Sequence, residues 1–176
     1  VRIMIPRSLV VATDYFDEFM RINGLGYIIS RDLADDDILS EFLNSVLPAE
    51  LYHELKVFVA TCSKPLAIRS SSKLEDSHYQ PFAGIYSTYM IPKQEDKYEM
   101  LRSLSDAIKA VYASVFYQDS KAYMTATSNL IDQEKMAIVL QEVVGTQYGD
   151  HYYPTISGVA RSLNFYPIGN EKAEDG

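Results

Sequence analysis

The chain is poor in cysteine, in basic residues and in long apolar runs. Cys62 is its one cysteine, so the sequence excludes an internal disulfide and any metal site built from several cysteines, and it is compatible with a reducing cytoplasm. We expect Cys62 to be a small apolar residue at a helix end rather than a nucleophile. The 16 Lys and Arg residues against 24 Asp and Glu residues give a net charge of −8. This charge argues against a nucleic-acid partner, because phosphate backbones select basic surfaces.

No stretch approaches the roughly 20 consecutive apolar residues that a helix needs to cross a bilayer, and no signal peptide is visible. We therefore expect no membrane association and a cytoplasmic location. The 176 residues, 47% of them apolar, suit one domain with a substantial core. Because the chain starts at Val1 without methionine and ends in the acidic stretch 171–176, we expect a piece of a longer protein with a disordered tail.

Apolar residues recur at helical spacing in several parts of the chain. Thr13 is expected to cap the first helix with its hydroxyl, and Asn23-Gly24 to end it, because glycine readily takes the left-handed conformation after a last turn. The acidic triplet 35–37 favours a helix start through the helix dipole over a divalent-cation site. The other predicted helices are two pieces within residues 31–63, one over about 96–116 and one over 118–125.

Segments rich in β-branched and aromatic residues predict strands at 85–91, 136–144 and 152–165. The segment 136–144 is an almost unbroken apolar run, which is typical of a strand buried on both faces. It contains the polar pair Gln141-Glu142, whose side chains have the chemistry to bind an adenine amine or a ribose hydroxyl. A plain core strand with a hydrated polar end explains the same pair.

A short apolar run delivers Arg69 and three serines, and a turn-rich segment then leads to Gly84. Arginine presents five fixed donors and stays charged, so it suits phosphate oxygens or a carboxylate. Glycine lets a backbone N–H approach a ligand that a side chain would block. The alternative is a strand end with a surface ion pair from Arg69 to Glu75 or Asp76, followed by a polar loop.

The sequence offers no metal ligands at coordinating spacing. The three histidines lie off the apolar stripes or in polar turns, far apart along the chain. We expect each of them to be exposed to solvent rather than catalytic; they are His53, His78 and His151.

Three stretches of the sequence match one known family. The run Ala67-Ile68-Arg69-Ser70-Ser71…Glu75-Asp76…Phe82-Ala83-Gly84 resembles the Ala-Val-Arg-Ser-Ser-Ala…Glu-Asp…Phe-Ala-Gly signature of the nucleotide-binding domain shared by phosphoenolpyruvate synthases and pyruvate phosphate dikinases. Residues 139–144 are similar to the Val-Val-Val-Gln-x-Met-Val strand of that family, and 157–160 to its Ser-Gly-Val-Ala strand. The resemblance implies an α+β, ATP-grasp-like fold. It has a helical first subdomain at about 1–135 and part of a β-rich second subdomain at 136–170, and the tail 171–176 follows.

The resemblance also implies a reaction, in which ATP gives a phosphoryl group to a histidine on a separate swivelling domain of the same protein. Arg69 is the implied catalytic residue because it would clamp the phosphates. By direct match to the family pattern, the implied ATP contacts are Arg69, Gly84, Thr88 and Gln141. Ser70, Glu142 and Val144 are further expected contacts because they lie next to or near these positions in the sequence. Mg²⁺ is implied as well, with its Asp-x-Glu ligands expected outside this chain and no metal ligand within it.

The sequence departs from the family pattern at several positions. Ile85 and Ser87 stand where the family has glutamine and an acid, and Asp119 and Met124 stand where it has arginines. Because of Asp119 and Met124, we expect no phosphate contact from the segment 118–125. Ile85 and Ser87 support an alternative, a degenerate domain of the same fold that senses nucleotides or binds partners without catalysis. We expect this chain alone to be inactive and to bind ATP weakly. The final phosphoryl acceptor (pyruvate, a glucan, an antibiotic or another molecule) and homo-oligomerisation stay open.

Overall fold

The computed structural model describes residues 3–75, 84–126, 134–158, 160, 162–164 and 167–175. The chain divides into two compact units, Val1–Val143 and Val144–Gly176. The sequence analysis placed the strand predicted at 136–144 at the start of a second subdomain. The observed division between the two units comes only after residue 143. That strand pairs inside the sheet of the first unit and therefore belongs with it.

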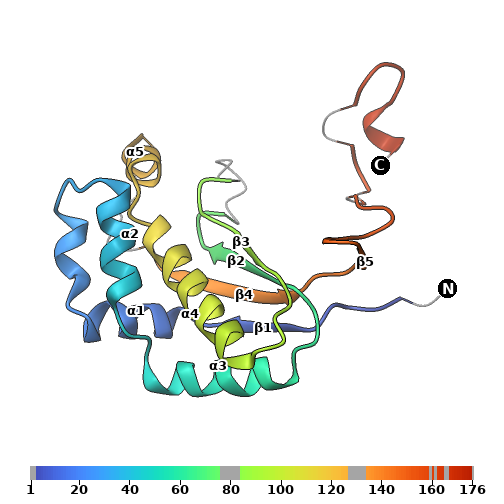
Figure 1. Cartoon of the computed structure of the whole chain (residues 1–176). Helices are drawn as coiled ribbons and strands as arrows, with labels where there is room; N and C mark the ends of the chain where they lie inside the picture. The colour runs from blue at the N-terminus through green and yellow to red at the C-terminus, as the bar shows by residue number, and fades with distance from the viewer. Residues whose placement is uncertain are drawn as a thin grey trace. The chain divides into compact units, whose positions relative to one another are not determined.

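The first unit contains a four-stranded antiparallel sheet with the order β1-β4-β2-β3 (Figure 1). Its strands are β1 (Ser8–Val11), β2 (Leu66–Ser72), β3 (Tyr89–Ile91) and β4 (Met136–Glu142). The two central strands come from distant parts of the chain and pair along their whole length, with Arg69 of β2 opposite Val139 of β4. This register sets which side chains of the two strands become neighbours.

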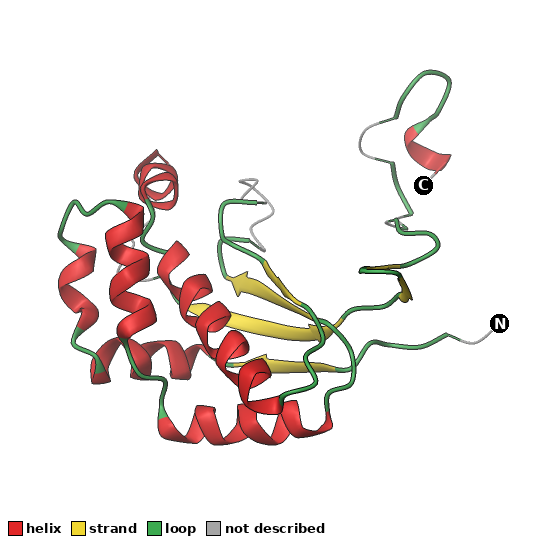
Figure 2. Cartoon of the chain, in the orientation of Figure 1, coloured by secondary structure: helices red, strands yellow, loops and turns green. Residues whose placement is uncertain are grey.

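The helices of this unit lie on one side of the sheet (Figure 2). They are α1 (Thr13–Ile22), the 3₁₀ helix η1 (Leu25–Ile29), α2 (Asp35–Asn44), α3 (Ala49–Thr61), α4 (Lys97–Ser114) and α5 (Gln118–Ala126). Helix α4 contacts β2, β3 and β4, whereas α1 contacts β4. Among the described residues, no helix is long and apolar enough to cross a membrane.

Five aromatic rings form the centre of the helical layer. Tyr112 of α4 lies with its ring centroid 5.0 Å from that of Phe16 and 5.4 Å from that of Phe19, both on α1. Phe42 of α2 joins the cluster at 5.6 Å from Phe19, and Phe116 completes it at 5.7 Å from Phe42. Edge-to-face and offset pairs of this kind add about 0.5–1.5 kcal/mol each beyond the area they bury.

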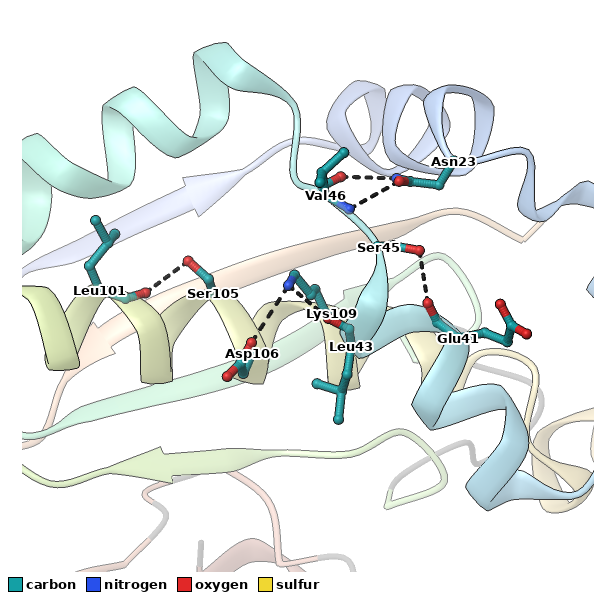
Figure 3. A network of polar contacts seen from close by, with 9 residues as sticks. All are labelled: Asn23, Glu41, Leu43, Ser45, Val46, Leu101, Ser105, Asp106 and Lys109. Carbon is teal, nitrogen blue, oxygen red and sulfur yellow. Dashed lines mark hydrogen bonds and ion pairs between the residues drawn. The ribbon is translucent and has the colours of Figure 1, made fainter.

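Polar side chains tie the helix ends together (Figure 3). Asn23, directly after α1, donates through its Nδ2 to the carbonyls of Phe19 (2.8 Å) and Val46 (2.9 Å) and accepts from the Val46 N–H at 3.0 Å. Lys109 of α4 donates to the carbonyl of Leu43 at 3.0 Å. The Asn23 bonds thus join the α2–α3 connection to α1, and the Lys109 bond joins the last turn of α2 to α4.

Most helices predicted from the sequence are confirmed, including both pieces within 31–63 and the two segments after residue 96. Gly24 follows α1 with φ +64°, the expected left-handed stop. The predicted cap was wrong, because Ala12 occupies the cap position and Thr13 is already the first helical residue, with no side-chain hydrogen bond at the cap. Cys62 is buried at the end of α3, as expected.

The strands differ more from expectation. In the predicted strand 85–91 only Tyr89–Ile91 pairs, and the described part of 152–165 is extended only as far as Tyr153. Strand β4 is not buried on both faces: Met136, Ile138 and Leu140 are buried, but the residues between them are half-buried. The reason is that the sheet is antiparallel and helices cover one face, so alternate side chains of β4 point away from the core.

The second unit is small. It has a hairpin of β5 (Thr146–Tyr148) and β6 (His151–Tyr153), with the rings of Tyr148 and Tyr153 stacked at 4.7 Å. Near its end, Ala173–Asp175 form a short 3₁₀ helix, η3, where the sequence predicted a disordered tail. The structure thus confirms the α+β class.

Candidate functional site

The sheet of the first unit presents one face away from the helices, which we name the open face. Because side chains alternate along each strand, every second residue of each strand lies on the open face. The register of the four strands shows which residues these are. Val10 and Met90 on this face are each 63% exposed. The set comprises Ser8, Val10, Ala67, Arg69, Ser71, Met90, Ala137, Val139 and Gln141.

Arg69 lies in the middle of the open face, directly opposite Val139. Its side chain is exposed, and within the described ranges it makes no hydrogen bond or ion pair. The expected alternative, an ion pair with Glu75, is not formed, because the Glu75 carboxylate accepts hydrogen bonds from Ser70 and Ser72. Asp76 lies outside the described residues. Arg69 is therefore a cation available to a ligand.

Gln141 is the second polar residue of the open face that the sequence singled out. Its register partner on β2 is Ala67, so Gln141 is the diagonal neighbour of Arg69, and such neighbours lie about 7–8 Å apart. Its Nε2 donates to the Ser8 hydroxyl of β1 at 3.2 Å. That bond orients the amide and leaves its oxygen able to accept from a ligand.

The structure does not bring the neighbours of these two residues onto the same face. Ser70 alternates to the helix side, where its hydroxyl donates to Glu75 Oε1 at 2.8 Å. Glu142 alternates in the same way, and its Oε1 lies 3.8 Å from Cys62 Sγ. Val144 is exposed and belongs to the second unit.

Gly84 and Thr88 bound the loop that leads into β3, and both are exposed. Gly84 has φ +84°, and a Cβ added there would meet no atom of the described residues within 4 Å. This glycine is needed for its backbone conformation rather than for close packing within the chain. Thr88 directly precedes Tyr89, whose partner on β2 is Ile68, so the loop returns to the sheet next to Arg69. Phe82 and Ala83 of the signature lie outside the described residues.

Two anchors hold this loop, and the sequence analysis missed both. The Tyr86 hydroxyl donates to Glu134 Oε1 at 3.1 Å, and the Ser87 N–H donates to the Ser114 hydroxyl of α4 at 3.2 Å. Burial raises the pKa of Glu134 above its usual range, and hydrogen bonds from Ser72 and Tyr86 offset part of that rise. The one sequence signal was an acid standing two residues before an apolar strand, which by itself does not name a partner.

Glu75 shapes the end of β2. Its carboxylate accepts from the Ser70 hydroxyl and, at 3.0 Å, from the Ser72 N–H, while its own N–H donates to the Ser72 hydroxyl at 3.4 Å. The carboxylate therefore satisfies backbone and side-chain donors where the strand turns away. This gives the acid of the signature a structural role beneath the open face.

The cavity and the described histidines below are not part of the open face. A cavity of about 410 Å³ lies instead between α1, η1 and Phe116. Within the described ranges, no group of three or more His, Cys, Asp and Glu side chains is placed to hold a metal ion. His53 and His151 are exposed, as expected, and His78 lies outside the described residues.

Comparison with known proteins places the chain in a family. The pattern of the family described as "Pyruvate phosphate dikinase, AMP/ATP-binding domain" matches residues 1–176. The chain belongs to this pyruvate phosphate dikinase nucleotide-binding family. Membership supports a nucleotide-binding role within a family of phosphotransferases, and it confirms the resemblance drawn from the signature around Arg69.

Two curated relatives agree with this membership. The chain is 26% identical over 178 residues to the uncharacterized phosphotransferase YvkC of Bacillus subtilis strain 168, an alignment that covers 97% of this chain and 18% of that protein. It is 25% identical over 168 residues to the phosphoenolpyruvate synthase of Aeropyrum pernix, covering 82% of this chain and 20% of the synthase. The chain thus spans about a fifth of the length of these relatives.

Proposed function

We propose that the open face binds ATP for a phosphotransferase of the phosphoenolpyruvate synthase and pyruvate phosphate dikinase type, within an ATP-grasp-like fold. The observation that carries this proposal is the pairing of Arg69 and Gln141 as neighbours on one exposed sheet face. A cation without a partner among the described residues stands there beside an amide held by a single hydrogen bond. Family membership supplies the identity of the ligand class.

The chemistry of the face suits a nucleotide laid along it. Arg69 would clamp phosphate oxygens with its planar, charged donors, and Gln141 would contact the adenine or ribose end. Val10 and Val139 offer exposed or half-buried apolar surface between the strands, which favours a flat ring. We assign the catalytic role to Arg69, because phosphoryl transfer depends on positioning and on neutralising charge.

The surroundings of the remaining predicted residues determine which of their atoms can contact the nucleotide. Gly84 would offer its N–H to the phosphates and Thr88 its hydroxyl beside them. Ser70 and Glu142 would contact the nucleotide through backbone atoms, because their side chains are engaged on the helix side. Val144 stays a predicted edge contact through its place in the stretch 139–144 that is similar to the family strand.

The whole reaction needs partners beyond this chain. We propose that the phosphoryl group passes to a histidine on a swivelling domain of the full-length protein, with Mg²⁺ neutralising the phosphates through ligands outside this chain. ATP as substrate and a buried thiol at Cys62 fit a cytoplasmic setting. We expect this chain alone to be inactive.

A titration of the full-length protein with ATP, ADP and adenosine tests the proposal. Arg69→Ala should weaken ATP and ADP binding about 10- to 100-fold, the effect of losing a hydrogen bond to a charged group, and leave adenosine binding unchanged. Gln141→Ala should weaken all three ligands. The matched control is Arg102→Ala on α4, an exposed arginine whose nearest acid is Glu99 at 3.8 Å. Wild-type affinity for ATP in Arg69→Ala would refute the proposal.

A non-catalytic nucleotide sensor is a second candidate, and one observation favours it. Ile85, at the position where the family pattern has glutamine, is half-buried and packs against the core, so it offers no polar group to a phosphate. Full-length protein that binds ATP but forms no phosphohistidine with Mg-ATP would support this candidate over the enzyme.

A further inference from the structure

The loop Gly84–Thr88 is fastened at its centre. Tyr86 is 5% exposed and Glu134 is 7% exposed, and the 3.1 Å hydrogen bond between them joins residues 48 positions apart in the chain. The next residue, Ser87, is held by its N–H to the Ser114 hydroxyl, which itself donates to the carbonyl of Val111 at 2.7 Å. Two consecutive loop residues are thus fixed to two different parts of the chain, namely the residue two positions before β4 and the end of α4.

Burying the Glu134 carboxyl beneath the loop has a desolvation cost. Removing a carboxyl from water costs free energy unless its oxygens are hydrogen-bonded, and two apolar side chains of similar size would pack there at lower cost. What the pair adds over an apolar contact is direction, because a hydrogen bond fixes where the Tyr86 hydroxyl lies. The loop backbone on either side follows from that position.

We propose that Tyr86 and Glu134 are positioning residues that hold the loop so that Gly84 and Thr88 meet the phosphates of the nucleotide. The inference rests on the proposed function, since it concerns the same site. Gly84 lies two residues before Tyr86, and Thr88 lies directly after Ser87, so both groups are oriented by the anchors between them. In this proposal the side chains of Tyr86 and Glu134 do not contact the nucleotide.

The geometry makes the effect selective for phosphates. The anchors control the loop, whereas Gln141 is oriented separately by Ser8 on β1. Loosening the loop should therefore affect ligands with phosphates and spare adenosine. A residue that merely stabilises the fold would change the binding of all ligands alike.

The test measures ATP and adenosine affinity of the full-length protein by calorimetry, with far-UV circular dichroism to confirm folding. Tyr86→Phe should weaken ATP binding at least about fivefold, because it removes the hydrogen bond to Glu134, with adenosine binding unchanged. Glu134→Leu should do the same. Glu134→Gln should recover most of that loss, because its side-chain oxygen still accepts from Tyr86. Tyr112→Phe is the matched control, since the Tyr112 hydroxyl is buried without a partner among the described residues.

The outcomes separate this inference from the function beneath it. Wild-type protein that fails to bind ATP would overturn both. If wild-type protein binds ATP and Arg69→Ala weakens it, while Tyr86→Phe leaves ATP binding unchanged or weakens ATP and adenosine equally, only the positioning role is overturned. Selective loss of ATP binding in Tyr86→Phe and in Glu134→Leu, with near wild-type binding in Glu134→Gln, supports it.

Discussion

Replacing Tyr112 with phenylalanine should make the protein more stable. Tyr112 is fully buried in the aromatic cluster of the helical layer, and within the part of the chain that the structure describes its hydroxyl has no hydrogen-bond partner. Burial alone raises the pKa of this tyrosine, with no charged neighbour contributing. The hydroxyl has lost its water without gaining a replacement.

The magnitude follows from that missing bond. Burying an unpaired hydroxyl costs about 1–3 kcal/mol in proteins. Tyr112→Phe removes that cost but keeps the ring, and with it the contacts to Phe16 at 5.0 Å and Phe19 at 5.4 Å. We expect the free energy of unfolding to rise by about 1 kcal/mol, and the melting temperature by about 2–4 °C.

Urea unfolding followed by far-UV circular dichroism measures this change, because α1 to α5 all lie in the first unit. The same substitution at Tyr86 provides the comparison. Tyr86→Phe should lower the free energy of unfolding by about 1–3 kcal/mol, since it removes a hydrogen bond to a buried carboxyl. If Tyr112→Phe instead lowered the free energy of unfolding by more than about 0.5 kcal/mol, the hydroxyl would have a partner such as a buried water, and the prediction would be wrong.

Three further outcomes follow from the structure. Folding raises the pKa of Glu134 above 4.5, so its contribution to the free energy of unfolding is fully present below that pH and is lost as the pH rises through the raised pKa. Glu134→Gln should therefore gain stability relative to wild type from about pH 4.5 upward, which urea titrations at stepped pH measure. Asn23→Ala should lower the free energy of unfolding by about 1–3 kcal/mol, because it removes two hydrogen bonds to Val46 and one to the last turn of α1. Asn44→Ala, at an exposed residue at the end of α2, should change it by less than about 0.5 kcal/mol. Gly145→Ala should shift the amide NMR signals of the β5–β6 hairpin, since a Cβ there would lie 2.8 Å from the backbone of β6. Gly158→Ala, where a Cβ would meet no described atom within 4 Å, should leave these signals in place.

The sequence predicted the helices well because their signal is local. The spacing of apolar residues along α4 is set by a face that packs on the sheet, and this spacing is visible without knowing the partner. Strand β4 was harder to interpret. Its apolar run is nearly continuous, yet its outward residues are only half-buried, and the sequence does not reveal how many faces of a sheet will be covered.

The candidate site could be predicted only in part. The motif pointed to Arg69 and Gln141, but their proximity depends on the pairing of β2 with β4, for which no local pattern exists. The period of two along a strand does contain further information, because it places Ser70 on the opposite face from Arg69, and Glu142 on the opposite face from Gln141. The Tyr86–Glu134 bond joins residues too distant for any sequence spacing to indicate.

The order of strands in the sheet affects how the protein is made. Strand β1 leaves the ribosome well ahead of β4, its pairing partner in the sheet, which ends at residue 142. At translation rates of about 5–20 residues per second, β1 waits on the order of ten seconds for that partner. During this interval the exposed Val10 and its neighbours have unpaired backbone groups, so nascent chains are most open to chaperone binding or to mispairing with each other before β4 emerges.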